Sequence, residues 1–164
     1  MTIKILIFTI ISLSSFAQNN WIYDEKEDRM IDKKIFYAYC ESVPENGGKS
    51  YTLIIKYAPI KSTDPSYGSI YEYDNSVYLN CNGCVFESSI FESNSLDIRF
   101  DTNEPIKWGY SGAKGSYEAV FLSNEKRLIK RLKNSKRVLV KIFIYGQGYK
   151  VIEFNVEGLK WNDL

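Results

Sequence analysis

The sequence predicts a mainly β protein: a single antiparallel, β-sandwich-like domain with one amphipathic helix near residues 124–134. Short runs in which apolar and polar residues alternate recur along the chain, as is typical of half-buried strands. Clusters of turn-forming residues separate these runs, and one segment has the apolar spacing of a helix. We expect this domain to span residues 18–164 and to follow a signal peptide at residues 1–17.

The first half of the domain predicts short strands joined by polar connections. In order, the expected elements are an apolar entry at 21–23, a charged loop at 24–34, a strand at 35–42, a turn at 43–48, a strand at 51–57, a proline-containing loop at 58–69 and a short edge strand at 70–73. Asn82-Gly83 then predicts a hairpin over residues 76–92, because a type I′ turn needs positive φ at both central positions.

The second half predicts further strands around the helix. The expected elements are strands at 95–100 and 106–108, a glycine-rich loop at 109–116, a strand at 117–122, the helix, strands at 137–145 and 149–156, and a single helical turn at 158–161. Ser123 is the expected N-cap of the helix, and Leu128, Ile129 and Leu132 form its apolar stripe.

The first seventeen residues have the three parts of a signal peptide. Lys4 gives a positive start, residues 5–11 are almost wholly apolar, and Ser15-Phe16-Ala17 fits a small-x-small cleavage site. The apolar run is shorter than the ~20 residues that span a bilayer, and no Cys follows it as a lipoprotein anchor requires. We therefore predict an exported protein, periplasmic or extracellular, cleaved near Ala17 and without a transmembrane segment after cleavage.

Composition excludes several classes of function. Residues 18–164 carry 20 basic and 20 acidic side chains, so no net field attracts nucleic acid or an anionic membrane. The absence of His excludes Ser-His and Cys-His nucleophile pairs and His-containing zinc sites. The carboxylates at 24–28, 97 and 101 are not placed together by any pattern, as a glycosidase pair would need. We expect a non-enzymatic protein that uses no cofactor and no metal.

Two surface features have both a structural and a functional interpretation. The 13 Tyr and 9 Phe residues favour aromatic side chains that pave sheet faces, and a tyrosine-rich binding surface is the alternative. Seven Lys or Arg residues fall within residues 126–137. The neutral overall charge favours the solvated side of a helix, and a docking face for an acidic partner or for anionic envelope polymers is the alternative.

Three cysteines are the disulfide candidates. Cys81 and Cys84 form a C-x-x-C pair around the expected turn, and an oxidising compartment favours a structural disulfide that involves Cys81. Cys84 is the nearer partner, and Cys40 is the other if its strand lies beside that of Cys81. A redox-active pair needs a helix N-terminus in a βαβ context, which this pattern lacks.

The order of several short motifs resembles the VasI-like proteins, which are exported type VI secretion accessory proteins with phage- and bacteria-encoded relatives. The motifs are Asp28-Arg29-Met30-Ile31-Asp32-Lys33-Lys34, Leu79-Asn80-Cys81, Ile98-Arg99-Phe100-Asp101 with Trp108 after it, and Phe154-Asn155-Val156-Glu157-Gly158-Leu159. The resemblance covers most of residues 18–164, implies fold and compartment, and names no catalytic residue. Many such proteins carry a C-terminal Cys that pairs with the position of Cys81, whereas no Cys follows Cys84 here.

A second resemblance lies in Ser111-Gly112-Ala113-Lys114, which is similar to the Ser-Gly-Ala-Lys-Tyr loop of periplasmic lysozyme inhibitors of the C-type class. In those inhibitors, the Ser and Lys of the loop meet the catalytic carboxylates of lysozyme. Here Gly115-Ser116 separates Lys114 from the next Tyr. We treat Ser111, Gly112, Ala113 and Lys114 as a candidate partner-binding loop.

The predicted function is therefore protein–protein binding in the bacterial cell envelope by an exported, non-enzymatic protein, with a secretion-system accessory as one form of that role. An inhibitor or immunity protein that blocks a cell-wall hydrolase such as lysozyme is the first alternative. A thiol–disulfide redox protein that uses Cys81 and Cys84 is the second. The sequence does not identify the protein partner.

Overall fold

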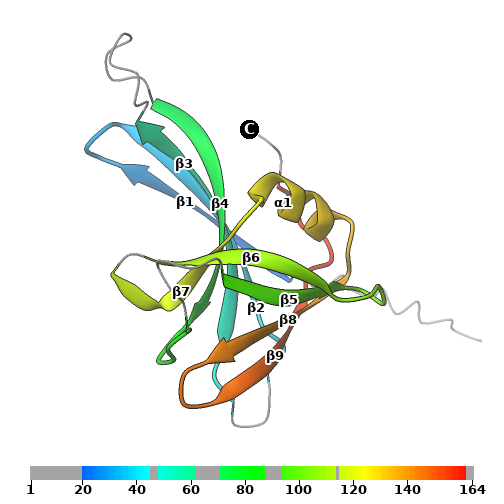
Figure 1. The fold of residues 1–164 in the computed structure, drawn as a ribbon. Helices are drawn as coiled ribbons and strands as arrows, with labels where there is room; N and C mark the ends of the chain where they lie inside the picture. The colour runs from blue at the N-terminus through cyan, green and yellow to red at the C-terminus, as the bar shows by residue number, and fades with distance from the viewer. Residues whose placement is uncertain (1–19, 45–47, 62–70, 88–93, 114, 162–164) are drawn as a thin grey trace, which may run out of the picture.

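The structure is a computed structural model that describes residues 20–44, 48–61, 71–87, 94–113 and 115–161, so the expected signal peptide lies outside the described residues. These residues form one mostly antiparallel β domain with a single helix, which confirms the predicted fold class (Figure 1). The elements are β1 (Trp21–Asp28), β2 (Lys33–Glu41), β3 (Tyr51–Lys61), β4 (Tyr71–Cys81), β5 (Asn94–Phe100), β6 (Ile106–Ala113), β7 (Ser116–Leu122), α1 (Glu125–Lys133), β8 (Arg137–Ile144) and β9 (Gly148–Asn155).

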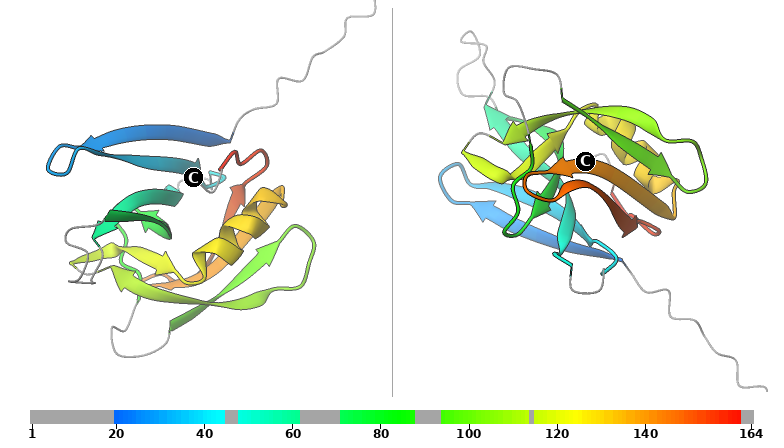
Figure 2. Two further views of the ribbon diagram at one scale, coloured as in Figure 1. Left: turned by 90° about the horizontal axis from the view of Figure 1, so that it is seen from above. Right: turned by 60° about the horizontal axis from the view of Figure 1, so that its bottom comes forward.

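All nine strands belong to one sheet in the order β1-β2-β3-β4-β7-β6-β5-β8-β9. The sheet curls until its ends approach each other, as the two views of Figure 2 show. Ser42, just after β2, forms a bridge with Phe154 of β9, and the Val43 N–H donates to the carbonyl of Glu153 at 2.8 Å. The Trp21 Nε1–H donates to the carbonyl of Val156 at 2.9 Å, which adds a side-chain tie between the same two ends.

A second closure is made by residues 84–87, which we call the bridging segment. The Phe86 N–H donates to the carbonyl of Tyr117 on β7 at 2.9 Å, and Phe86 bridges to Ile144 on β8. The Tyr145 N–H donates to the carbonyl of Val85 at 2.8 Å. The bridging segment therefore spans the gap between β7 and β8, two strands that are not neighbours in the sheet order.

The core lies inside the curled sheet. Alternate residues of strands such as β5 and β8 are buried, as the period of two requires, and the apolar stripe of α1 packs into the same core. The fully buried side chains include Leu53, Ile55, Leu79, Phe86, Ile98, Leu122, Leu128, Ile129, Leu132, Ile142 and Phe154. On β2, Ala38 and Cys40 are buried and Phe36 packs against the core.

Several predicted boundaries are wrong in the first half of the chain. The expected loop at 24–34 is mostly the β1–β2 hairpin, because an edge strand exposed on both faces accommodates charge, and Lys34 and Glu25 form a cross-strand ion pair at 2.8 Å. β3 continues through Pro59 to Lys61, where β2 no longer pairs with it and a proline needs no ladder donor on that side. The short strand expected at 70–73 is part of the long β4, of which residues 71–73 are described.

Four further predictions are corrected. The hairpin expected over 76–92 does not form, because the chain leaves β4 after the Asn82-Gly83 turn and enters the bridging segment; residues 88–92 lie outside the described residues. The loop expected at 109–116 is strand up to Ala113, since it pairs with β7. Asn124, at a left-handed φ of 56°, is the N-cap of α1 in place of Ser123, and residues 158–161 form no helical turn.

Candidate functional site

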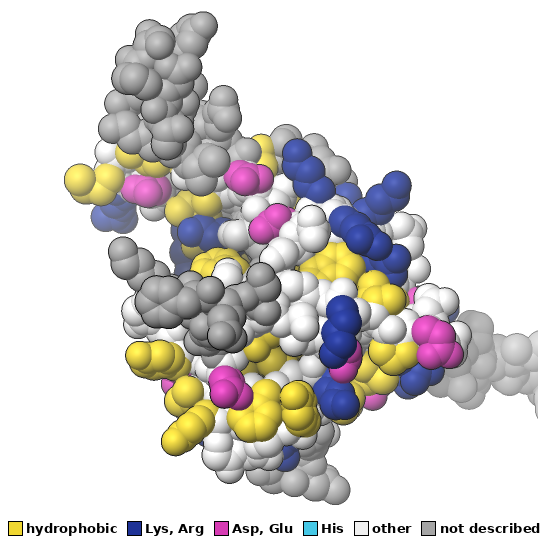
Figure 3. Space-filling view, in the orientation of Figure 1, with side chains coloured by type: hydrophobic (Ala, Val, Ile, Leu, Met, Phe, Trp, Pro, Cys, Tyr) yellow, Lys and Arg dark blue, Asp and Glu magenta, His cyan; other side chains and the backbone are white. Residues whose placement is uncertain are grey.

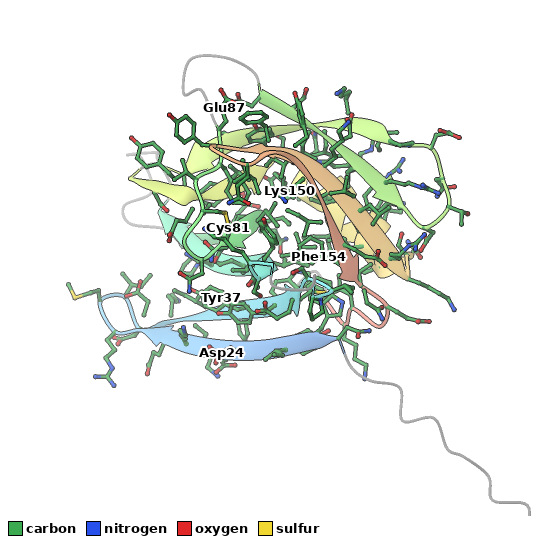
Figure 4. The ribbon with its side chains drawn as sticks, turned by 90° about the horizontal axis from the view of Figure 1, so that it is seen from below. Asp24, Tyr37, Cys81, Glu87, Lys150 and Phe154 are labelled. Atoms are coloured by element: carbon green, nitrogen blue, oxygen red, sulfur yellow. A yellow bond between two sulfur atoms is a disulfide. The ribbon has the colours of Figure 1, made fainter. Side chains whose placement is uncertain are left out.

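The Cys81–Cys84 disulfide ties the end of β4 to the bridging segment, with the two Cα atoms 5.7 Å apart. This confirms the disulfide expected for Cys81 and selects Cys84 as its partner. Both residues are almost completely buried, at 0% and 4% exposure, so the bond lies under the surface that the segment carries. Figure 4 labels Cys81 at this position in the interior.

Cys40 is the free thiol. It is buried on the inner face of β2, and its Sγ lies 3.2 Å from the carbonyl oxygen of Asn155. Burial raises the pKa of this thiol to about 12, so it stays protonated and is a poor nucleophile at neutral pH. Cys40 therefore acts as a small buried apolar side chain and not as a disulfide partner.

The candidate partner-binding loop is not a loop for most of its length. Ser111, Gly112 and Ala113 are the last residues of β6, and Ser111 faces Phe121 across the β6–β7 pair. Lys114 lies outside the described residues. Gly115, at a φ of 82°, belongs to the turn that leads into β7. A binding role for these four residues stays a prediction.

Exposed aromatic side chains gather around the bridging segment. The bridging segment lies between β7 and β8, so its hydrogen bonds bring Tyr117, Val85 and Tyr145 onto adjacent strands. Tyr149 of β9 pairs with Phe143 of β8, with ring centroids 5.2 Å apart in an edge-to-face contact. We call five residues the tyrosine patch: Val85, Tyr117, Phe143, Tyr145 and Tyr149. In Figure 3, hydrophobic side chains gather at the lower left, over β7 and the β8–β9 turn.

The tyrosine patch is unusually open for apolar groups. Tyr117, Tyr145 and Tyr149 are 72%, 73% and 70% exposed, and Val85 is 40% exposed. An aromatic side chain has ~150–250 Å² of surface, so the three tyrosines present on the order of 400 Å². A standard protein interface buries about 800 Å² on each side, so the patch supplies the apolar centre of one and needs a polar rim to complete it.

Polar groups surround the tyrosine patch and hold its backbone. Lys141 lies with its Nζ 5.3 Å from the centre of the Tyr149 ring, in cation–π contact. The Tyr110 hydroxyl donates to the carbonyl of Glu87 at 2.7 Å, and burial raises the pKa of Tyr110, so the hydroxyl keeps its proton as a donor. Glu87, labelled in Figure 4, belongs to the bridging segment, which also carries Val85. The scaffold beneath the patch is therefore fixed, and its tyrosine rings face solvent.

Four further aromatic side chains, on β2, β4 and β7, form two ring pairs. Tyr37 and Tyr39 stack at 5.7 Å on β2, and Tyr78 of β4 contacts Phe121 of β7 at 5.4 Å. Burial raises the pKa of Tyr78 to about 12. These contacts are cross-strand and same-strand pairs of the kind that stabilise sheets, as expected for aromatic side chains that pave a sheet face.

A hollow of about 360 Å³ lies between the β1–β2 hairpin and the C-terminal segment, with Phe36 and Trp161 among its walls. The Lys160 N–H donates to the Tyr23 hydroxyl at 2.7 Å, and the Trp161 Nε1–H donates to Asn75 Oδ1 at 2.9 Å. These bonds dock the C-terminal segment against β1 and β4. We interpret the hollow as part of that packing and assign it no ligand.

The acidic residues singled out in the sequence are dispersed. Asp97 of β5 pairs with Lys107 at 2.8 Å, whereas the Asp101 carboxylate accepts the backbone N–H groups of Lys136 and Arg137 at 2.8 and 3.0 Å. Among the described residues, no group of three or more Cys, Asp or Glu side chains is placed to hold a metal ion. Within the same residues, no helix has the length and apolar character needed to cross a bilayer.

No known protein family, no curated protein and no solved structure matches the chain. A tyrosine-rich binding surface was the alternative interpretation of the aromatic residues, but the residues of the tyrosine patch were not predicted, although the sequence contains one signal for them. Tyr145 and Tyr149 flank the Gly146-Gln147-Gly148 turn, where a large exposed aromatic residue on each side is unusual for a solvated hairpin end. Nothing in the sequence places Val85 and Tyr117 beside them.

Proposed function

We propose that this is an exported, non-enzymatic protein that binds another protein in the bacterial cell envelope, and that the tyrosine patch is its contact surface. The observation that carries the proposal is the patch itself: three tyrosines, each about 70% exposed, above a segment held by a disulfide. Tyrosine is enriched at the energetic centres of interfaces, because its rigid ring buries much area at little cost in conformational entropy.

The ordered backbone under the tyrosine patch supports a binding role for the exposed rings. The bridging segment is tied to β7, to β8 and to β4 by backbone hydrogen bonds and the disulfide. A surface that is already ordered loses less conformational entropy on association, which raises affinity. The expected signal peptide and the resemblance to VasI-like proteins support an envelope partner, such as a component of a secretion apparatus.

Inhibition of a cell-wall hydrolase is the second candidate function, and the position of the β6–β7 turn favours it. Ser111, Gly112 and Ala113 end the strand that leads into this turn, and the exposed Tyr117 follows it. An inhibitor of this kind would place Lys114 against the carboxylates of the enzyme. Lys114→Ala would then abolish inhibition of lysozyme in a cell-wall lysis assay.

The redox alternative gains no support from the site. A reactive disulfide needs an accessible sulfur in an electropositive environment. Cys81 and Cys84 are 0% and 4% exposed, and in the described part of the chain the one helix begins at Glu125, after β7, and not at either cysteine. We assign this disulfide a bracing role.

Site-specific photo-crosslinking in the source bacterium tests the proposal. A photoreactive phenylalanine analogue replaces Tyr145 in the full-length chain, and a matched variant carries it at Met30, which is 91% exposed in the β1–β2 turn. We expect a discrete crosslink to one envelope protein from position 145 and none to that protein from position 30. Equal crosslinking from both positions, or none from position 145, would contradict the tyrosine patch as the contact surface.

A further inference from the structure

The exposed face of α1 is strongly basic, and its charges are not neutralised. The helix carries Lys126, Arg127, Lys130, Arg131 and Lys133 with Glu125 as its one acidic residue. No ion pair joins any of these five cations to a carboxylate among the described residues, although the two basic residues that follow the helix are both paired: Lys136 with Glu157 at 3.2 Å and Arg137 with Glu153 at 3.7 Å. Figure 3 shows this basic surface at the upper right, away from the tyrosine patch.

Part of this arrangement opposes the stability of the helix. Like charges four residues apart repel, and the helix contains two such pairs, Lys126 with Lys130 and Arg127 with Arg131. The helix dipole favours Lys130, Arg131 and Lys133 in the last turn and disfavours Lys126 and Arg127 near the start. A solvated helix face usually alternates its charges, so the repulsion between these like-charged pairs points to a functional use.

Two of the cations are held in place. The Arg127 guanidinium lies 5.4 Å from the centre of the Trp108 ring, and the Arg131 guanidinium lies 5.2 Å from that of Phe100. These two rings are in edge-to-face contact and nearly buried, so they form a common platform under the two arginines. Cation–π contact restricts the guanidinium groups and leaves their N–H donors available to a ligand.

The two arginines and Lys130 line one hollow of about 350 Å³ between α1 and the turn after β5. The carboxylate in this hollow, Asp101, already accepts two backbone N–H groups, and those donors hold its pKa below the usual range. The hollow is therefore lined by three cations and one carboxylate, and that carboxylate is hydrogen-bonded to backbone N–H groups. The hollow is large enough for a tetrahedral oxyanion with the groups attached to it.

We propose that the basic face of α1 binds a phosphate-bearing anionic polymer other than a nucleic acid, with a phosphate group seated between Arg127 and Arg131. A planar carboxylate is saturated by one arginine fork, whereas phosphate oxygens point in several directions and engage several cations. Lys126 and Lys133 lie beyond the hollow, about 10 Å apart along the helix, so a chain of anionic groups satisfies more of the face than a single anion does.

Fluorescence anisotropy with labelled linear polyphosphate tests this proposal on residues 18–164. We expect saturable binding that weakens steeply with added salt, and roughly tenfold weaker binding for each arginine removed in Arg127→Gln/Arg131→Gln, since a charge-assisted hydrogen bond contributes about that factor. Lys136→Gln/Arg137→Gln is the matched control, because it removes the same formal charge from paired residues. Equal losses in both double variants would show a general field effect and overturn the proposal.

A conservative variant and two competitors complete the test. Arg127→Lys/Arg131→Lys keeps the charge and packs along the same rings, so it tests the role of the guanidinium groups even if the Gln variant fails to fold. We expect about threefold weaker binding of polyphosphate. Unchanged binding would refute a phosphate site between the two arginines. Polyglutamate of equal charge should compete poorly. Stronger competition by polyglutamate would indicate an acidic protein, and stronger competition by single-stranded DNA would indicate a nucleic acid; either result contradicts the proposal. The assay contains no protein partner, so its failure leaves the tyrosine patch untouched.

Discussion

At the scale of single residues, Asp101 joins two connections that are distant in sequence. It has a positive φ of 52° in the turn after β5, a conformation that Asp and Asn tolerate better than most residues. Its Oδ1 accepts the N–H groups of Lys136 and Arg137, and its own N–H donates to the carbonyl of Arg137 at 2.8 Å. The turn after β5 is therefore fastened to the start of β8, next to the hollow under α1.

Asp101→Asn should lower the free energy of unfolding by about 1 kcal/mol at neutral pH, since solvent screens an exposed carboxylate. The backbone N–H groups lower the pKa of Asp101 from its ordinary 3.8, so its charge stabilises the fold above that value. The difference from wild type should shrink as the pH falls through the lowered pKa. Urea denaturation at several pH values measures it.

Asp97→Asn is the control for this effect. Asp97 lies on β5, four residues before Asp101, and pairs with the exposed Lys107, so Asp97→Asn should lower the free energy of unfolding little. If Asp101→Asn and Asp97→Asn behave alike, or if the effect of Asp101→Asn does not vary with pH, the charge of Asp101 does not stabilise the fold in the way described.

At the scale of elements, the bridging segment decides how the sheet closes and where the tyrosine patch stands. It is four residues long, and its Phe86 side chain is 1% exposed between β7 and β8. One end is covalently tied to β4 through the disulfide. The bridging segment therefore fixes the position of the exposed Val85, because its neighbour Phe86 is buried in the core.

Cys81→Ala/Cys84→Ala should lower the free energy of unfolding by about 2 kcal/mol, which is the loop-closure entropy expected for a four-residue loop. Because the disulfide holds one end of the bridging segment, amide hydrogen exchange should accelerate most at Phe86 and Tyr145, whose N–H groups bond across it. Cys40→Ala is the control, since it removes a buried sulfur far from the segment in sequence. Exchange that rises equally throughout β8 and β9, or that stays unchanged at Phe86, would contradict this account.

The sequence predicted most elements, and it failed where tertiary pairing overrides local pattern. The β8–β9 hairpin and α1 were found because alternation, turn glycines and helical spacing are local signals. β1 was missed because its charges resemble a loop until β2 pairs with it. The bridging segment was placed in a hairpin with β4, since Asn82-Gly83 is a strong local signal and its true partners on β7 and β8 lie far along the chain.

The candidate site was predictable only in its parts. The disulfide followed from compartment and spacing, and Cys84 was the nearer of the two partners considered. The convergence of Val85, Tyr117 and Tyr145 depends on how the sheet curls, which no local pattern specifies. Likewise, the basic stretch was visible in the sequence, whereas the rings of Trp108 and Phe100 beneath its arginines were not.

At the scale of the whole molecule, the neutral charge balance hides two different surfaces. The tyrosine patch lies over β7 and the β8–β9 turn, and the basic face lies over α1 at the other side of Figure 1. The curled sheet between them is closed by bridges at both ends, so it holds the two surfaces in a fixed relation. The two proposed contact surfaces therefore lie apart, so a protein partner and an anionic polymer would not compete for one surface.

The affinity for the crosslinked envelope protein, measured by calorimetry with purified components, tests the central claim most directly. We predict that Tyr145→Ala/Tyr149→Ala raises the dissociation constant by at least about thirtyfold, because central interface tyrosines contribute about 2 kcal/mol or more. Met30→Ala, an exposed apolar residue outside the tyrosine patch, should leave the constant unchanged. An unchanged dissociation constant for the tyrosine variant, with its fold intact, would contradict the assignment of the tyrosine patch as the binding surface.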